Sequence, residues 1–146
     1  MTPADMKAVG ARFIEEIINQ GKISVLDEAL APDFVDHSLP PGLPADREGQ
    51  KMLLAGLRTA FPDIHYSIDK DFVDGDHLVH YVTATGTMTG PFLGVQPTGK
   101  RATWNEAHIV RFAGDKVVEH WAVVDQLGML VQLGVIDNPA AAPAPA

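Results

Sequence analysis

Two tight-turn signals in the second half of the chain restrict the fold more than any other feature. Asp74-Gly75 and Gly114-Asp115 each separate two runs in which apolar and polar residues alternate. Such dipeptides between alternating runs are typical of β-hairpins. The sequence therefore predicts two hairpins, formed by residues 65–73 with 77–88 and by residues 101–113 with 116–124.

The first half of the chain carries helix signals instead. Thr2 suits an N-cap, Pro3 the first helical position and Gly21 the C-terminal end. Further elements are expected as a helix at 23–30, a strand at 33–38, a helix at 47–60 capped by Asp46, and a closing helix at 127–133. Helices followed by a run of antiparallel strands indicate an α+β fold.

Length and composition limit the other possibilities. Residues 1–138 are expected to form a single domain, and the Ala/Pro-rich tail, residues 139–146, to be disordered. The formal net charge of −8 argues against nucleic acid or an anionic membrane as partner. No signal-peptide pattern and no bilayer-spanning apolar run is evident, so we expect a cytoplasmic protein.

The sequence gives no support for a metal or a cofactor. There is no cysteine, which excludes thiolate ligands and disulfides. His77 and His80 lie three positions apart on an expected strand and so point to opposite faces. His108 and His120 could approach each other across a hairpin, but two imidazoles without a third ligand make a weak site. We expect neither a metal nor a cofactor.

The register of the second hairpin decides which polar residues share a face. A two-residue loop pairs His108 with Trp121, whereas a three-residue loop pairs His108 with His120 and Glu106 with Ala122. A slip of one residue exchanges the two faces, so the pattern alone leaves both registers open.

Under the three-residue loop, one face gathers the residues that acid–base catalysis requires. A carboxylate and two imidazoles then lie among aromatic side chains. The residues of this face are Trp104, Glu106, His108, Phe112 and His120. The alternative is that each polar member is exposed or hydrogen-bonded for structural reasons, as polar networks often are.

Three further polar residues are candidates because of their positions. Asp125 precedes the closing helix, where it is either a helix cap or a pocket carboxylate, and a cap can serve as both. Asp36 and His37 are neighbours on the early strand, so at most one points inward. Trp121 is expected in the core.

Four blocks of sequence together resemble a known family. They are DFVDHSLPPG (33–42), GPFLGVQPTGKR (90–101), NEAHIVRFAGDKVVEHW (105–121) and DQLGMLVQLG (125–134). With the order of helices and strands, they resemble the SnoaL-like polyketide cyclases, or ester cyclases, of the nuclear transport factor 2-like superfamily. The resemblance implies a cone-shaped barrel in which N-terminal helices pack on a curved antiparallel sheet, with a short C-terminal helix.

The resemblance also implies an activity. Cyclases of this family close a polyketide methyl ester by an intramolecular aldol reaction, without cofactor or metal, after a carboxylate has formed an enolate. The family's pocket histidines fall on His108 and His120, and an early polar pocket residue on Asp36. Its catalytic aspartate falls on Ala122. In the register that the resemblance selects, Glu106 lies across from Ala122, and we hypothesise that Glu106 supplies the missing base.

The sequence thus predicts an enzyme of the lyase or isomerase type. Under this hypothesis His108 stabilises an enolate oxygen, and His120 has an orienting or proton-relaying role. The catalytic candidates are Glu106, His108, His120 and Asp125. The substrate-binding candidates are Asp36, His37, Trp104, Phe112 and Ala122.

The expected partners are a hydrophobic small molecule and a second copy of the chain, bound through the outer face of the sheet. The enzymatic alternative is an epoxide hydrolase or a ketosteroid isomerase-like enzyme, because these chemistries also use one pocket carboxylate in this fold. The other alternative is a non-catalytic binder of a hydrophobic metabolite. An inward Glu106 flanked by His108 favours catalysis.

Overall fold

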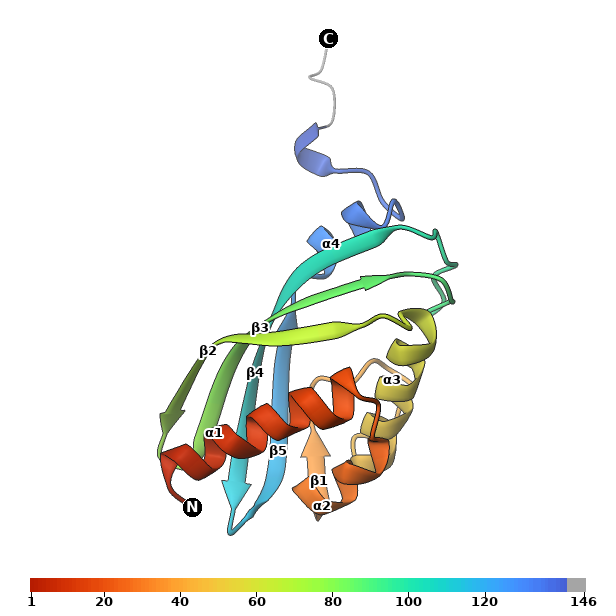
Figure 1. The fold of residues 1–146 in the computed structure, drawn as a ribbon. Helices are drawn as coiled ribbons and strands as arrows, with labels where there is room; N and C mark the ends of the chain where they lie inside the picture. Colours follow the sequence, from red (N-terminus) through yellow and green to blue (C-terminus); the bar gives the residue numbers. More distant parts are fainter. Residues whose placement is uncertain (142–146) are drawn as a thin grey trace.

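A curved five-stranded sheet organises the fold, and α1 crosses one of its faces (Figure 1). The computed structural model describes residues 1–141. The helical segments are α1 (Pro3–Arg12) with a π-helical continuation (Phe13–Asn19), a 3-10 turn (Ile23–Val25), α2 (Leu26–Ala29), α3 (Arg47–Ala60), α4 (Gln126–Gln132) and a 3-10 turn (Pro139–Ala141). The strands are β1 (Leu30–Asp36), β2 (His65–Asp74), β3 (His77–Thr87), β4 (Arg101–Ala113) and β5 (Lys116–Val124).

Local capping signals explain where the helices begin. The side chain of Thr2 accepts a hydrogen bond from the Asp5 backbone, and Asp5 returns one to the Thr2 backbone, which makes a capping box. Asp46 accepts from the Gly49 backbone at 3.0 Å and starts α3. The helix at 47–60 and the strands at 101–113 and 116–124 have the predicted bounds.

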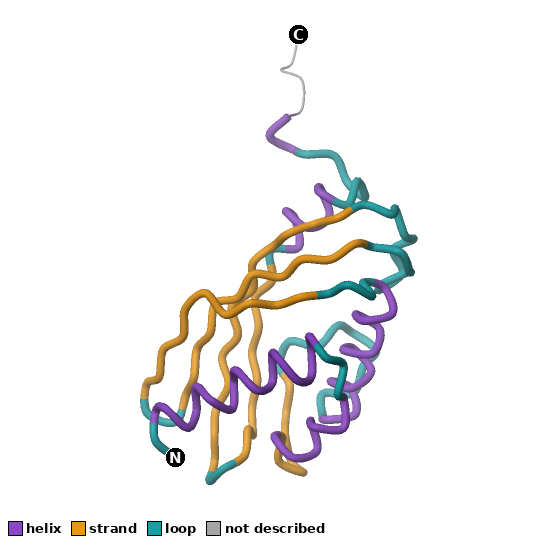
Figure 2. Tube along the Cα trace, in the orientation of Figure 1, coloured by secondary structure: helices purple, strands orange, loops and turns teal. Residues whose placement is uncertain are grey.

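The early strand differs from the prediction. β1 begins at Leu30 rather than Asp33 and pairs with β5 in parallel, at the edge of the order β1-β5-β4-β3-β2. The other three strand pairs are antiparallel. Figure 2 shows the strands, in orange, side by side in one sheet. The sheet is therefore mixed, and the parallel pair brings the end of β1 beside His120.

The second hairpin has neither of the two expected registers. Ala113 pairs with Lys116 across a two-residue turn, but a β-bulge follows, so that His108 pairs with Ala122 and Glu106 with Val124. The inserted residue shifts the pairing by one and exchanges the faces of β5. Glu106, His108 and His120 therefore share the inner face, as predicted, although Glu106 does not lie across from Ala122.

The helices lie close to the inner face of the sheet. On β3 the buried residues alternate, with Leu78, His80 and Val82 facing the helices. Gly10 on α1 allows this approach, because a Cβ at this position would lie 2.7 Å from Cδ2 of Leu78. The 3-10 turn Pro139–Ala141 begins the tail that was expected to be disordered, and residues 142–146 lie outside the described residues.

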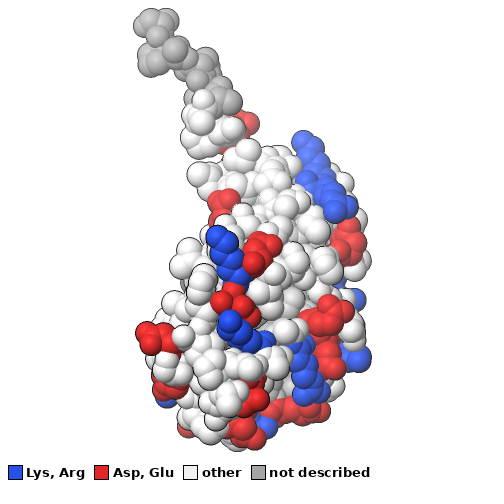
Figure 3. Space-filling view, turned by 60° about the vertical axis from the view of Figure 1, so that its left-hand side comes forward, with Lys and Arg blue, Asp and Glu red and all other residues white. Residues whose placement is uncertain are grey.

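Charged residues of both signs are interspersed on the face that Figure 3 draws. Within residues 1–141, no helix combines the length and the apolar character needed to cross a membrane.

Candidate active site

A cavity of about 330 Å³ lies between the helices and the inner face of the sheet. Most of its lining is apolar, and its volume is in the range of small-molecule sites. Polar side chains gather on one wall, where β4 and β5 adjoin the end of β1. The polar residues of this wall are Asp36, Ser38, Glu106, His108 and His120.

Glu106 lies at one end of this polar wall and accepts three hydrogen bonds. Its Oε2 accepts from the Tyr66 hydroxyl and from Nε1 of Trp104, both at 2.7 Å. Its Oε1 lies 2.8 Å from Nε2 of His108. Burial raises the pKa of Glu106, but the hydrogen bond and charge of His108 and the two other donors outweigh it, so the net pKa is lowered. Glu106 is therefore an ionised acceptor.

Tyr66 remains a donor to this carboxylate. Burial, together with the negative charge of Glu106 and the hydrogen bond to it, raises the pKa of the Tyr66 phenol well above its usual value. The phenol thus stays protonated and holds Glu106 in place.

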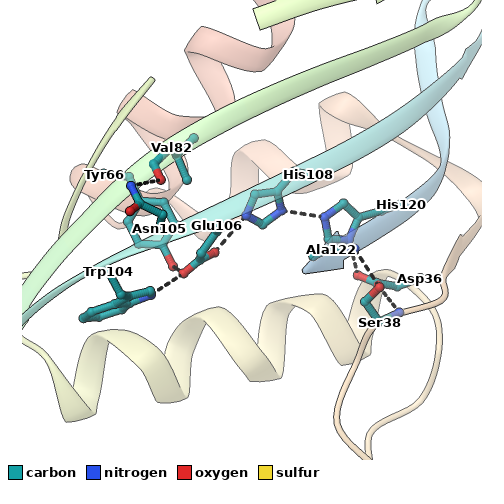
Figure 4. A network of polar contacts seen from close by, with 10 residues as sticks. All are labelled: Asp36, Ser38, Tyr66, Val82, Trp104, Asn105, Glu106, His108, His120 and Ala122. Carbon is teal, nitrogen blue, oxygen red and sulfur yellow. Dashed lines mark hydrogen bonds and ion pairs between the residues drawn. The ribbon is translucent and has the colours of Figure 1, made fainter. Parts of the chain in front are cut away.

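The polar contacts continue from Glu106 in a line across both imidazoles (Figure 4). Nδ1 of His108 lies 2.8 Å from Nε2 of His120, and Nδ1 of His120 lies 2.8 Å from Oδ2 of Asp36. The other oxygen of Asp36 accepts from the Ser38 backbone at 2.9 Å. We call Glu106, His108, His120 and Asp36 the acid–base network.

The three hydrogen bonds of the acid–base network require three protons. Ionised carboxylates only accept, so the ring nitrogen facing each carboxylate carries a proton. If both rings were neutral, the nitrogens at the His108–His120 contact would present two lone pairs to each other. The contact therefore needs a third proton. The four groups therefore share one proton more than two carboxylates and two neutral imidazoles would hold.

His80, on β3, lies beside the acid–base network. Its ring packs edge-on against His108, with centroids 5.3 Å apart. Burial, followed by the charges of His108 and His120, lowers the pKa of His80 to about 3. His80 is therefore a neutral neighbour at physiological pH. Its alternation with Leu78 and Val82 indicates an inward position, although from the sequence His80 was weighed only as a metal ligand.

The substrate-binding candidates divide into two groups. Asp36, Trp104, Phe112 and Ala122 line the cavity, whereas His37 is not among its lining residues. Nε2 of His37 lies 2.8 Å from Oε2 of Glu119, and its ring stacks on Trp121 with centroids 4.8 Å apart. Trp121 was expected in the core but lies on the outer face of the sheet. Its neighbours on β5, His120 and Ala122, line the cavity, so the side chain of Trp121 points the other way. Its ring lies between those of His37 and His77.

Asp125 is the N-cap of α4. Its side chain accepts from the Gly128 backbone at 3.0 Å, and it is absent from the residues that line the cavity. Of the two alternatives for this residue, the structure shows the cap.

The surroundings of Ala122 correct the expectation for Glu106. Ala122 lies across from His108, and its backbone N–H donates to Oγ of Ser38 at 2.7 Å. Glu106 lies across from Val124 and is held by Tyr66, Trp104 and His108, so it does not occupy the space over Ala122. On this side of the network the carboxylate is Asp36 (Figure 4).

Ser38, Gln50 and Tyr66 also line the cavity, and none of them was predicted from the sequence as a site residue. Tyr66 is the buried member of an alternating strand, which is the signal that could have found it. Gln50 lies one helical turn before Leu53 and Leu54 on α3, and Ser38 lies two residues beyond the end of β1.

The helices and the curved sheet enclose a mostly apolar cavity with buried acid–base groups. This architecture is typical of proteins of the nuclear transport factor 2-like fold that bind small molecules. The sequence profile of the SnoaL-like polyketide cyclases matches residues 8–133. The chain belongs to this family.

Individual relatives agree with this assignment. The chain is 24% identical over 119 residues to nogalonic acid methyl ester cyclase of Streptomyces nogalater, an alignment that covers 80% of this chain and 88% of the relative. The structure of TsrD from Streptomyces laurentii superposes with a TM-score of 0.85 at 25% identity, covering 93% of this chain and 99% of TsrD. IdmH from Streptomyces antibioticus gives a TM-score of 0.76 at 32% identity, covering 88% and 97%.

Proposed function

We propose that this protein is a cofactor-free acid–base enzyme that enolises a polyketide ester and closes a ring by intramolecular aldol addition. The observation that carries this proposal is the hydrogen bond between His108 and His120, two carboxylate-bound imidazoles in the wall of an apolar cavity. The similarity to nogalonic acid methyl ester cyclase supports a polyketide ester as the substrate class.

In the proposed first step, the substrate opens the His108–His120 contact. Each ring keeps its hydrogen bond to its own carboxylate, so the opened pair presents one N–H and one lone pair to the cavity. The N–H donates to a substrate carbonyl oxygen while the lone pair removes a proton from the adjacent carbon. Paired acid and base groups of this kind contribute about 10²–10⁴-fold each to a rate.

The second step returns the protons. The enol carbon forms the new C–C bond with a second carbonyl carbon, whose oxygen takes the proton that the base imidazole removed. The enol O–H proton goes back to the other imidazole as the first carbonyl re-forms. The network ends with the three protons with which it began, so no cofactor enters the proposed reaction.

Glu106 and Asp36 are positioning residues in this mechanism. Each fixes the ring nitrogen that faces it as a proton donor, which leaves the other nitrogen of each ring for the substrate. The side chains of Glu106 and Asp36 are 6% and 0% exposed, whereas those of His108 and His120 are 15% and 12% exposed. The imidazoles are therefore the groups of the network that a substrate reaches. Trp104 and Phe112 supply apolar walls for the substrate.

Deuterium exchange tests the proposal. Nogalonic acid methyl ester is incubated with the protein in D₂O, and mass spectrometry follows both deuterium incorporation at the activated carbon and ring closure. We expect incorporation with the wild type and a loss of at least about tenfold in His108→Asn and in His120→Asn. His77→Asn, on the outer face, is the matched control and should keep the wild-type rate. No incorporation above the protein-free rate, or full activity in both variants, would contradict the proposal.

We also propose that the protein is a homodimer through the outer face of the sheet. Apolar side chains adjoin there on three neighbouring strands: Tyr81, Ile109 and Val123 are 41%, 38% and 75% exposed, and Ile109 pairs with Trp121. Exposed apolar patches of this kind often mark interfaces. Light scattering should give a dimer mass for the wild type and a monomer mass for Val123→Glu. A monomeric wild type would contradict the dimer.

A further inference from the structure

A buried polar side chain of α3 lacks a hydrogen-bond partner on the cavity wall. Within residues 1–141, two buried side-chain atoms have no partner, Oε1 of Gln50 and Nδ1 of His80. Nδ1 of His80 lies toward α1, since a Cβ on Gly10 would be 3.5 Å from it. Gln50 lines the cavity and is 5% exposed.

The position of Gln50 on its helix favours an apolar residue. Leu53, Leu54 and Leu57 follow at helical spacing, and all line the same cavity. The backbone of Gln50 is satisfied, because its N–H donates to the Asp46 carbonyl at 3.1 Å. An unpaired buried acceptor destabilises the folded state, because it loses its hydrogen bonds to water and gains none. A leucine would avoid that cost, so the amide at this position points to a ligand that supplies a donor.

We propose that Gln50 is a specificity-determining residue that accepts a hydrogen bond from a free hydroxyl group of the substrate. This inference rests on the proposed function and narrows its substrate class to polyketides with a phenolic or enolic hydroxyl on the side that faces α3. A methyl ether or a deoxy analogue leaves Oε1 unpaired, and a site that is built to accept a hydroxyl proton discriminates against such analogues.

The expected preference is modest for one neutral hydrogen bond. The free hydroxyl should bind about tenfold more tightly than its methyl ether. In Gln50→Leu the preference should disappear. The same substitution should raise the melting temperature of the free protein, because it replaces an unpaired acceptor with an apolar side chain among leucines.

Calorimetric binding of 2-naphthol and 2-methoxynaphthalene tests the proposal at pH 7. The wild type should prefer 2-naphthol about tenfold, Gln50→Leu should bind both alike, and Gln20→Leu, the same substitution at an exposed glutamine outside the cavity, should keep the preference. Equal binding of the two probes by the wild type, no binding of 2-naphthol, or an unchanged preference in Gln50→Leu would overturn it.

The binding assay separates this inference from the proposed reaction, because it needs no turnover. Catalysed deuterium exchange without hydroxyl preference overturns the assignment of Gln50 alone. A hydroxyl preference that Gln50→Leu abolishes, in a protein without catalysed exchange, supports the assignment and overturns the reaction.

Discussion

Nδ1 of His108 lies 2.8 Å from Nε2 of His120, and the remaining nitrogen of each ring lies 2.8 Å from a carboxylate oxygen. This line of four groups holds one proton more than two carboxylates and two neutral imidazoles supply. A site of this kind can both donate and accept a proton without a change in its total charge. The number of protons that these hydrogen bonds require leads to predictions that can be tested without knowing the substrate.

Amide substitutions at the two ends should be strongly non-additive. In Glu106→Gln the new N–H donates to His108, both rings become neutral, and all three hydrogen bonds remain. Asp36→Asn has the same effect from the other end. In the double variant both amides donate inward, so each neutral ring carries its proton on the nitrogen that faces the other ring. Two N–H groups then face each other, and the hydrogen bond between the rings is lost. The amides cannot turn around, because Trp104 and the Ser38 backbone hold their oxygens.

Urea unfolding of the wild type, both single variants and the double variant measures this coupling. We expect the double variant to be less stable than the sum of the single effects, by about 0.5–3 kcal/mol. Additive effects within about 0.5 kcal/mol would show that the network does not share its protons in this way.

His80 should make the protein sensitive to mild acid. Its pKa is about 3 in the folded state, below the ordinary 6.5, so the unfolded state binds a proton that the folded state does not. The free energy of unfolding therefore has its full value above pH 6.5 and falls below it, with a limiting slope of about 1.4 kcal/mol per pH unit. Chemical unfolding between pH 7 and 5 should show this slope reduced in His80→Phe. An unchanged slope in that variant would disprove the role of His80.

Removing the Tyr66 hydroxyl should raise the pKa of Glu106. Because the folded pKa of Glu106 is lowered, its stabilising contribution is present above about pH 4.5 and is lost as the pH falls through the folded value. Tyr66→Phe should cost about 1.5–3 kcal/mol at pH 7, as expected for a hydrogen bond to a charged group.

Tyr81→Phe is the matched control, because Tyr81 is 41% exposed on the outer face. Carbon-13 titration of the Glu106 carboxyl group reads the pKa directly. A pKa in Tyr66→Phe that equals the wild-type value would contradict the assigned hydrogen bond.

Asp125→Ala should affect the stability of the protein and not its chemistry. The loss of the α4 cap should cost about 1 kcal/mol in urea unfolding. Deuterium incorporation into the ester should continue at the wild-type rate, because Asp125 does not line the cavity. A large loss of exchange in a folded variant would return Asp125 to the active site.

Local signals allowed much of the fold to be predicted. The Asp46 cap and the Gly114-Asp115 turn act within a few residues, and the elements beside them have the predicted bounds. The parallel pairing of β1 with β5 has no local signal, because its partners are far apart in the sequence. The bulge in β5 lies close to the turn, but the alternating pattern carries no signal for an inserted residue, and the bulge shifts every pair beyond it.

For the site, too, local patterns allowed some residues to be placed, whereas contacts between distant segments were not predicted. Alternation along β4 was sufficient to place Glu106 and His108 on one face, and the family resemblance supplied the histidine positions. The partner of Glu106 across the hairpin was predicted wrongly, because the bulge moves Ala122 from Glu106 to His108. The contact of Asp36 with His120 depends on the parallel pairing, so no pattern within one strand could have shown it.

We infer that one proton is shared between two imidazoles held by two carboxylates. Long-range proton–nitrogen correlation spectra of the protein labelled with nitrogen-15 histidine count the protons on His108 and His120 at pH 7, with assignments from single histidine variants. We expect three of the four ring nitrogens to be protonated in the wild type and two in Glu106→Gln. Two protonated nitrogens in the wild type would contradict this inference.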